Sequence, residues 1–312
     1  MDALEKLENT KRIVDAVCAE WPPHEKTARK SLAERSGEVL STTESLASQI
    51  VKLCGGRQED IETLARDYRF TCEKILLPEE LHFRRINSYR LSRFEDADRE
   101  VYSDPALMGP YLNGLLLSYV MWSNHAHAID HYLRRFLPGT PACARHLEIG
   151  PGHGFLLYYA CLSPSIESVN GWDVSSESVE STQRALSRLQ APKRVNLQQR
   201  NILRLAPEET ADQYDNIVLS EILEHLEDPV AALVSARAAL KPGGRVWISI
   251  PANSPAPDHL FLINSPEHAC ELVSKAGLSV VESHAFPTAG ATVEKALQRK
   301  LSISCVITAV KS

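Results

Sequence analysis

The fold of this chain is decided by the stretch HLEIGPGHGF at residues 146–155. An apolar run ends there in an acid, Glu148, and glycines follow at alternate positions. Glycine tolerates positive φ and lets the backbone approach a ligand without a Cβ in the way. The pattern E-x-G-x-G-x-G therefore predicts a buried strand that turns sharply into a helix around a ligand. It lacks both the spacing of the dinucleotide fingerprint and the lysine of a P-loop.

Further β-rich apolar stretches follow this loop in order. They lie at residues 166–174, 195–199, 214–220, 245–251, 278–282 and 301–310. The second strand ends in an acid, Asp173, and ligands of open α/β sheets bind beyond the carboxyl ends of the strands. An acid at that position suits the diol of a ribose, so Asp173 is our ribose-binding candidate.

The ordered set resembles the class I S-adenosylmethionine-dependent methyltransferases. The resemblance covers residues 142–312 and implies a Rossmann-like α/β sheet of seven strands, the last one antiparallel, that binds S-adenosylmethionine. Where the family usually carries an acid for the adenine amino group this chain has Asn201, whose side-chain carbonyl can accept the same hydrogen bond. The cofactor-binding residues that the resemblance implies are Glu148, Gly150, Gly152, Gly154, Asp173, Val174, Asn201, Ile202, Ser220 and Glu221.

The segment EILEH at residues 221–225 follows the fourth strand and contains residues that we expect to take part in catalysis or metal binding. On a helical turn Glu221, Glu224 and His225 would lie at i, i+3 and i+4, which is one face. Two carboxylates and an imidazole bind a divalent cation when a further ligand joins them, and His259 is our candidate for that ligand.

This arrangement is similar to that of two metal-using branches of the family. They are the ubiquinone-biosynthesis O-methyltransferases and, more weakly, the small-RNA 2′-O-methyltransferases, which have a second histidine where this chain has Leu226. The resemblance implies a Mg, Mn, Zn or Fe ion that lowers the pKa of the acceptor hydroxyl. The residues leave a metal-free site equally open, in which His225 or His259 is the base and Glu224 assists.

The first 141 residues predict a separate helical domain that caps the pocket, binds substrate and offers a surface for a homodimer. Helices are expected at residues 2–20, 38–54 and 58–76, and a long one at 103–137; residues 84–102 are expected to form a connector or a lid. Tyr119, Trp122 and His125 on the long helix are the candidate substrate residues. The alternative is an ordinary helical core stripe.

Composition excludes other classes of function. The chain has 312 residues and a net charge of −6, and residues 1–141 carry 19 basic and 22 acidic residues, so a nucleic-acid partner is not expected. Without an apolar run of about 18 residues or a secretory signal pattern, we expect no membrane span and a cytoplasmic protein. The seven cysteines include no C-x-x-C pair.

We therefore expect methylation of a hydroxyl or carboxyl oxygen on a small metabolite, in keeping with natural-product biosynthesis. One alternative is N-methylation of a small amine or peptide, which needs no metal. Another is a catalytically silent protein that binds S-adenosylmethionine and acts through its helical half.

Overall fold

The computed structural model describes residues 7–204 and 211–312, and the chain divides into two compact units. The first unit comprises residues 1–130, 253–262 and 286–304, and the second comprises the rest. The sequence places a single boundary at residue 141. The structure divides the chain differently, because two later segments belong to the helical unit. One follows the fifth strand, and the other runs from the end of the sixth strand to the start of the seventh.

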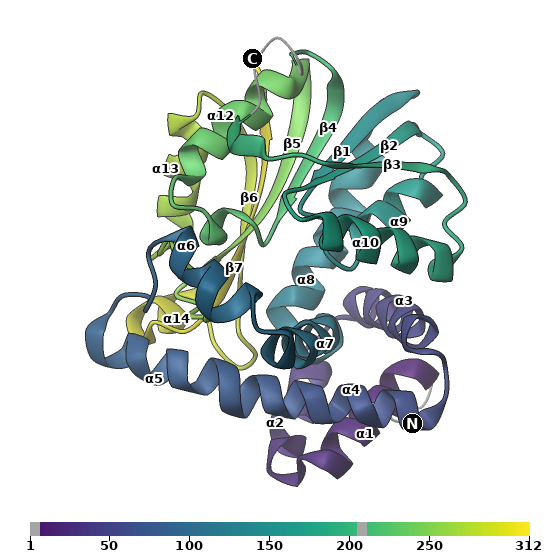
Figure 1. Ribbon diagram of the computed structural model, residues 1–312, viewed down its shortest axis with the longest axis vertical. Helices are drawn as coiled ribbons and strands as arrows, with labels where there is room; N and C mark the ends of the chain where they lie inside the picture. The colour runs from purple at the N-terminus through teal and green to yellow at the C-terminus, as the bar shows by residue number, and fades with distance from the viewer. Residues whose placement is uncertain (1–6, 205–210) are drawn as a thin grey trace. The chain divides into compact units, whose positions relative to one another are not determined.

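The second unit is built on a seven-stranded sheet with the strand order β3-β2-β1-β4-β5-β7-β6 (Figure 1). The strands are β1 (Ala144–Ile149), β2 (Ile166–Asp173), β3 (Val195–Gln199), β4 (Tyr214–Ser220), β5 (Leu240–Ala252), β6 (Ser279–Pro287) and β7 (Ile303–Val310). β1 pairs in parallel with β2 and β4, and the last strand is antiparallel. The predicted Rossmann-like sheet is confirmed.

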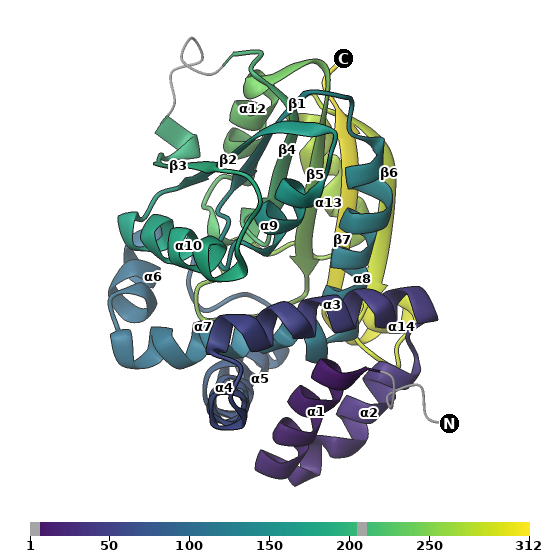
Figure 2. The same cartoon turned by 90° about the vertical axis from the view of Figure 1, so that its right-hand side faces the viewer.

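Helices cover both faces of this sheet (Figure 2). They are α9 (Phe155–Leu162), α10 (Ser176–Leu189), α12 (Pro229–Ala239) and α13 (Pro266–Lys275). The central strands are buried on both faces, which explains their continuous apolar runs. Ile217, Val218 and Leu219 of β4 have no solvent-exposed surface, and burial of each such side chain contributes about 1.5–3 kcal/mol.

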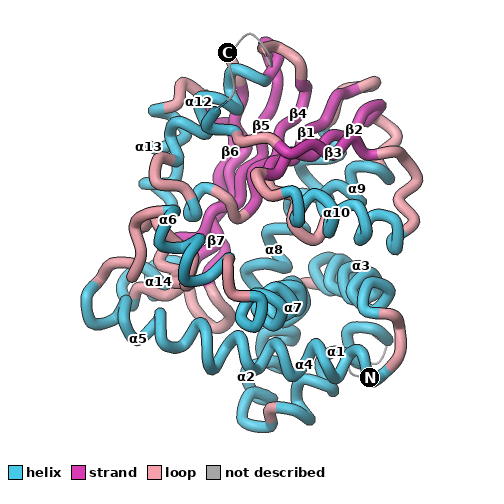
Figure 3. The backbone as a smooth tube through the Cα atoms, in the orientation of Figure 1, coloured by secondary structure: helices cyan, strands magenta, loops and turns pink. Residues whose placement is uncertain are grey.

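The first unit is a helical bundle with one short carboxyl-terminal helix (Figure 3). Its helices are α1 (Glu8–Glu20), α2 (Glu25–Ala33), α3 (Gly37–Cys54), α4 (Gln58–Phe70), α5 (Leu77–Ile86), α6 (Phe94–Ala97), α7 (Pro105–Met121), α8 (Ser123–His131) and α14 (Val293–Arg299). The apolar stripes of α1, α3 and α4 form its core, where Ile13, Leu46 and Ile61 are fully buried. Residues 2–6 of the first predicted helix lie outside the described residues.

The single helix predicted at residues 103–137 is wrong. α7 begins after the Asp104 cap, but Trp122 adopts an extended conformation (φ −98°, ψ 124°) and separates α7 from α8. Beyond His131 the chain continues as a π-helical turn, Tyr132–Phe136. Helical periodicity runs through this break because the apolar spacing is preserved, so the sequence pattern did not reveal it.

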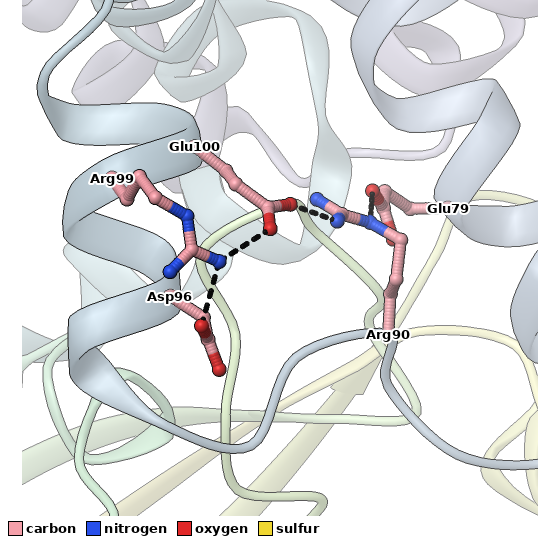
Figure 4. A network of polar contacts seen from close by, with 5 residues as sticks. All are labelled: Glu79, Arg90, Asp96, Arg99 and Glu100. Atoms are coloured by element: carbon pink, nitrogen blue, oxygen red, sulfur yellow. Dashed lines mark hydrogen bonds and ion pairs between the residues drawn. The ribbon is translucent and has the colours of Figure 1, made fainter.

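The polar segment at residues 84–102 is held by ion pairs within the helical unit (Figure 4). Arg90 donates to Glu79 (Nε to Oε1, 2.8 Å) and to Glu100 (Nη1 to Oε2, 2.6 Å). Arg99 bridges Asp96 and the same Glu100. Arg90, in the loop that follows α5, is therefore tied both to α5 and to the helical turn that contains Glu100.

No described helix combines the length and the apolar character that a membrane span requires.

Candidate functional site

The glycine loop joins β1 to α9 at the carboxyl edge of the sheet. Gly150, Gly152 and Gly154 have φ values of 65°, 49° and 74°, so all three occupy the left-handed region that favours glycine. A Cβ on Gly150 would overlap Cδ1 of Ile222, whereas a Cβ on Gly152 would meet no atom within 4 Å. The loop is thus closely packed at its first glycine and open at its second.

Glu148 lies beneath this loop on β1, between Gly171 of β2 and Val218 of β4. Its side chain is buried, and its Oε2 atom has no hydrogen-bond partner in the described part of the chain. Burial raises the pKa of this carboxyl well above its usual value, against an opposing hydrogen bond from the backbone of Leu157. A buried carboxyl oxygen without a donor fits a ligand that brings a cationic or N–H group.

The next acid at this edge is Asp173, the last residue of β2. Its Oδ1 accepts a hydrogen bond from the amide of Ser175 (2.9 Å), and burial raises the pKa of the carboxyl. Val174 beside it is exposed. The Glu148 carboxyl suits the ammonium group of S-adenosylmethionine, and the Asp173 carboxyl suits its ribose hydroxyls. The space over Gly152 is open.

Asn201 and Ile202 follow β3, which pairs with β2 in parallel. The Oδ1 atom of Asn201 accepts from the amide of Leu203 (2.9 Å), and Ile202 is buried. The Asn201 carbonyl therefore stabilises its own turn and retains one lone pair for a further donor. Its predicted contact with adenine stays a prediction.

The structure corrects the predicted helical face at residues 221–225. Glu221 has a left-handed backbone (φ 52°), and the only helical residues of the segment form a 3₁₀ turn, Leu223–His225. Glu221 therefore lies outside the turn, and its Oε1 accepts a hydrogen bond from Oγ of Ser249 on β5 (2.6 Å). A single strand-end residue with positive φ changes the direction of the chain, so the i, i+3, i+4 face does not form.

The other two residues of this segment differ in exposure. The Glu224 side chain is fully buried, while the His225 side chain is 23% exposed and its Nε2 lies 3.7 Å from Oε1 of Glu224. Ser220 precedes them as the last residue of β4 and pairs with Ser249. Of Glu224 and His225, only His225 has access to solvent.

His259 lies in the helical unit, on the segment that follows β5. Its Nδ1 lies 2.6 Å from the carbonyl oxygen of Ser254, and the residue is 8% exposed. A metal site that combines His259 with Glu221, Glu224 and His225 stays a prediction.

The three candidate substrate residues lie together in the helical unit. The His125 ring is 4.9 Å from the Trp122 ring and 6.0 Å from the Tyr119 ring, and its Nδ1 lies 2.9 Å from Oγ of Ser118. The indole N–H of Trp122 donates to the hydroxyl of Tyr68 (2.9 Å). All three are half-buried, and their substrate role stays a prediction.

Sequence reasoning missed three residues that shape the site. Ile222 packs on Gly150, Ser249 binds Glu221, and Thr182 on α10 donates to the carbonyl of Gly152 (2.7 Å). Ser249 could have been found from its place near the end of the fifth strand. Ile222 and Thr182 carry no such pattern.

Comparison with known proteins supports the same family. The family model described as "Methyltransferase domain" matches residues 121–283, just over half of the chain. A ubiquinone biosynthesis O-methyltransferase from Xanthomonas axonopodis is 30% identical over 136 residues, which are 43% of this chain and 54% of that protein. One from Marinobacter nauticus is 31% identical over 132 residues, 42% of this chain and 53% of that protein. The chain thus spans about half the length of these curated relatives.

Solved structures show more distant likeness. A methyltransferase from Aquifex aeolicus is 15% identical, with a TM-score of 0.46, over 70% of this chain and 99% of that chain. One from Mesorhizobium loti is 16% identical, with a TM-score of 0.44, over 59% and 97%. Likeness at this level bears on no function, and the assignment rests on the family model and the glycine loop. The chain belongs to the methyltransferase-domain family, among the class I S-adenosylmethionine-dependent methyltransferases.

Proposed function

We propose that this protein transfers the methyl group of S-adenosylmethionine to a hydroxyl or carboxyl oxygen of a small metabolite. The observation that carries the proposal is the edge of the sheet where the Glu148 carboxyl, the open glycine loop and Asp173 lie on adjacent strands. The oxygen acceptor is inferred from the relatives named as O-methyltransferases. When bound, S-adenosylmethionine supplies an electrophilic methyl group on a good leaving group.

The residues of this chain would hold the cofactor and accept a proton. Glu148 would pair with the ammonium group, Asp173 would accept from the ribose hydroxyls, and the backbone of the glycine loop would lie along the ligand. Charge-assisted hydrogen bonds of this kind are worth about 1.5–3 kcal/mol each. Positioning then supplies much of the rate, because methyl transfer needs an in-line approach of the acceptor.

Proton removal is assigned to histidine. A hydroxyl acceptor must lose a proton as it is methylated, and His225 and His259 are the two candidate proton acceptors. A divalent metal bound through Glu221, Glu224, His225 and His259 is the metal-assisted form of the same proposal. S-adenosylmethionine itself needs no metal to bind.

The cofactor part is tested by calorimetric titration of S-adenosylmethionine and of its demethylated product. We expect Asp173→Ala to weaken binding by about 10- to 100-fold, since a carboxylate hydrogen-bond pair is lost. Glu177→Ala, an exposed acid on α10, is the matched control and should bind as wild type. Absence of binding to the wild-type protein would overturn the proposal.

The acceptor part is tested with S-adenosylmethionine carrying a radiolabelled methyl group. Catechol, a benzoic acid and a primary amine are the probes, each after chelator treatment and with Mg, Mn, Zn or Fe restored. Label on catechol or on the carboxylate supports oxygen methylation, and restoration by one metal supports the metal-assisted form. Label on the amine alone would overturn the oxygen assignment.

A further inference from the structure

The segment at residues 253–262 presents a histidine from an irregular part of the helical unit. Ser254, Asp258 and His259 lie on it, and the last two are buried, at 4% and 8% exposure. A loop backbone alone does not fix the orientation of an imidazole ring that it carries. Other side chains must therefore hold the ring in one direction. The helical unit supplies these contacts.

The first contact sets the protonation of the His259 ring. Its Nδ1 lies 2.6 Å from the carbonyl oxygen of Ser254, and a carbonyl oxygen can only accept a hydrogen bond. Nδ1 therefore carries the proton in the neutral ring, and Nε2 carries the lone pair. A base or a metal-binding histidine requires this tautomer at the reacting nitrogen.

The second contact comes from Tyr89, which touches both partners of that hydrogen bond. Its hydroxyl accepts from the amide of Ser254 (3.2 Å), and its ring meets the His259 ring edge-on at 5.6 Å and 62°. Tyr89 is buried, at 8% exposure. One side chain thus fixes the residue whose carbonyl orients the imidazole and also packs against the imidazole itself.

Tyr89 is in turn held by its own surroundings. The next residue, Arg90, is paired with Glu79 and Glu100 (Figure 4). The Phe83 ring lies 5.8 Å from the Tyr89 ring. Paired in two directions, Arg90 fixes the backbone that carries Tyr89.

Asp258, next to His259 on the same segment, is also held by hydrogen bonds. The hydroxyls of Tyr111 and Tyr102 donate to the Asp258 carboxylate at 2.9 and 3.3 Å. The backbone on both sides of His259 is therefore fixed before any ligand binds.

We propose that Tyr89 is a positioning residue for His259: it holds the Ser254 carbonyl against Nδ1 and so keeps Nε2 as the nitrogen that accepts a proton or a metal. The inference rests on the proposed function for the role of His259, but the tautomer itself is a property of the protein without substrate. The two can therefore fail separately.

The tautomer is measured by NMR of ¹⁵N-histidine-labelled full-length protein, with His259 assigned from the His259→Gln spectrum. We expect a protonated Nδ1 and an unprotonated Nε2 in the wild type, and a mixture of tautomers in Tyr89→Phe, which keeps the ring and loses the hydroxyl. An Nε2-protonated ring in the wild type, or an unchanged His259 in Tyr89→Phe, would overturn the positioning role. The wild-type tautomer does not depend on whether Tyr89→Phe folds.

Turnover with catechol as the acceptor probe gives the second measurement. Tyr89→Phe should lower kcat by about 10-fold, a fraction of what a general base contributes, and change the KM for S-adenosylmethionine less than twofold. Tyr214→Phe removes a hydroxyl at the amino end of β4, far along the strand from the glycine loop, and should leave both constants unchanged. A rise in KM equal to the fall in kcat would show general loosening and count against positioning.

Failure of the proposed function has a different signature. If His259→Gln turns over as fast as wild type, or if wild type methylates no oxygen probe, the role of His259 in the reaction is wrong. The NMR result then still decides whether Tyr89 sets the tautomer.

Discussion

At the scale of single residues, two buried titratable groups on β1 have strongly shifted pKa values. Glu148 and His146 are both buried and lie two residues apart on the same strand. Burial disfavours the charged form of each, so it raises the pKa of the acid and lowers that of the base. Both therefore make stability depend on pH, in opposite directions.

The first prediction concerns Glu148. Its pKa is raised from 4.5, so the folded protein binds more protons than the unfolded one above pH 4.5, and stability falls as pH rises, by about 1.4 kcal/mol per pH unit. Glu148→Gln removes this loss and should be the more stable protein at pH 7.5, yet bind S-adenosylmethionine at least about 10-fold more weakly. Calorimetric unfolding and ligand titration measure the two effects. A variant less stable than wild type at pH 7.5 would contradict the argument.

The second prediction concerns His146, whose Nε2 lies 3.4 Å from the hydroxyl of Tyr132. Burial lowers its pKa from 6.5 to about 3, so below pH 6.5 the unfolded chain binds the extra proton. Stability from this group falls by about 1.4 kcal/mol for each unit of pH lost down to pH 3. In His146→Gln, the free energy of unfolding should fall less steeply as the pH is lowered from 6.5 to 4. An unchanged slope would show that other groups control acid unfolding.

At the scale of elements, the glycine loop works because its three glycines meet different surroundings. Gly150 lies against Ile222 of the turn after β4, while Gly152 faces open space. The loop is thus joined to the EILEH turn by packing at one point and left accessible at another. The two glycines differ because the chain leaves β4 beside Gly150 and places Ile222 against it.

The third prediction compares alanine at these two glycines. Gly150→Ala meets both a left-handed backbone and a steric overlap with Ile222, so we expect destabilisation of about 2–3 kcal/mol and loss of cofactor binding. Gly152→Ala meets only the backbone strain, about 1 kcal/mol. Thermal unfolding and titration with S-adenosylmethionine distinguish them. In Gly150→Ala, the added Ile222→Val should recover part of the loss, and equal effects at both glycines would contradict the packing argument.

At the scale of the whole molecule, the helical unit is completed by segments from the carboxyl-terminal half of the chain. The carboxylate of Glu34 accepts from the amide of Gly290, Lys300 bonds Asn87, and Asp258 binds Tyr111. Each of these contacts lies within the first unit and joins residues more than 140 positions apart. The helices at the start of the chain therefore need residues from the carboxyl-terminal half to complete their packing.

The fourth prediction follows for a fragment that ends at residue 141. It lacks residues 253–262 and 286–304, so Tyr89, Tyr102 and Tyr111 lose their buried partners, and we expect a partly folded, aggregation-prone fragment. Circular dichroism and amide NMR dispersion, compared with the full chain, measure this. A cooperative unfolding transition and a dispersed spectrum in the fragment would instead support the boundary at residue 141.

The sequence by itself determined the seven strands in their order along the chain and the glycine loop, whereas their order within the sheet came from the structure. Alternating glycines, an acid at each of the first two strand ends and buried apolar strands are local patterns, and local patterns specify local structure. For the same reason it located Glu148 and Asp173 correctly at the carboxyl edge. The break at Trp122 and the left-handed backbone of Glu221 left no trace in the spacing of residues.

Only the tertiary structure decided which segments form the helical unit and which groups surround His259. Some of these groups lie far from His259 in the sequence, others are common residue types beside it, and no periodicity links them. They are Tyr89, Tyr111, Ser254 and Asp258. Their hydrogen bonds exist because the chain returns to the helices after β5, and contacts between distant segments are chosen by packing rather than by local pattern.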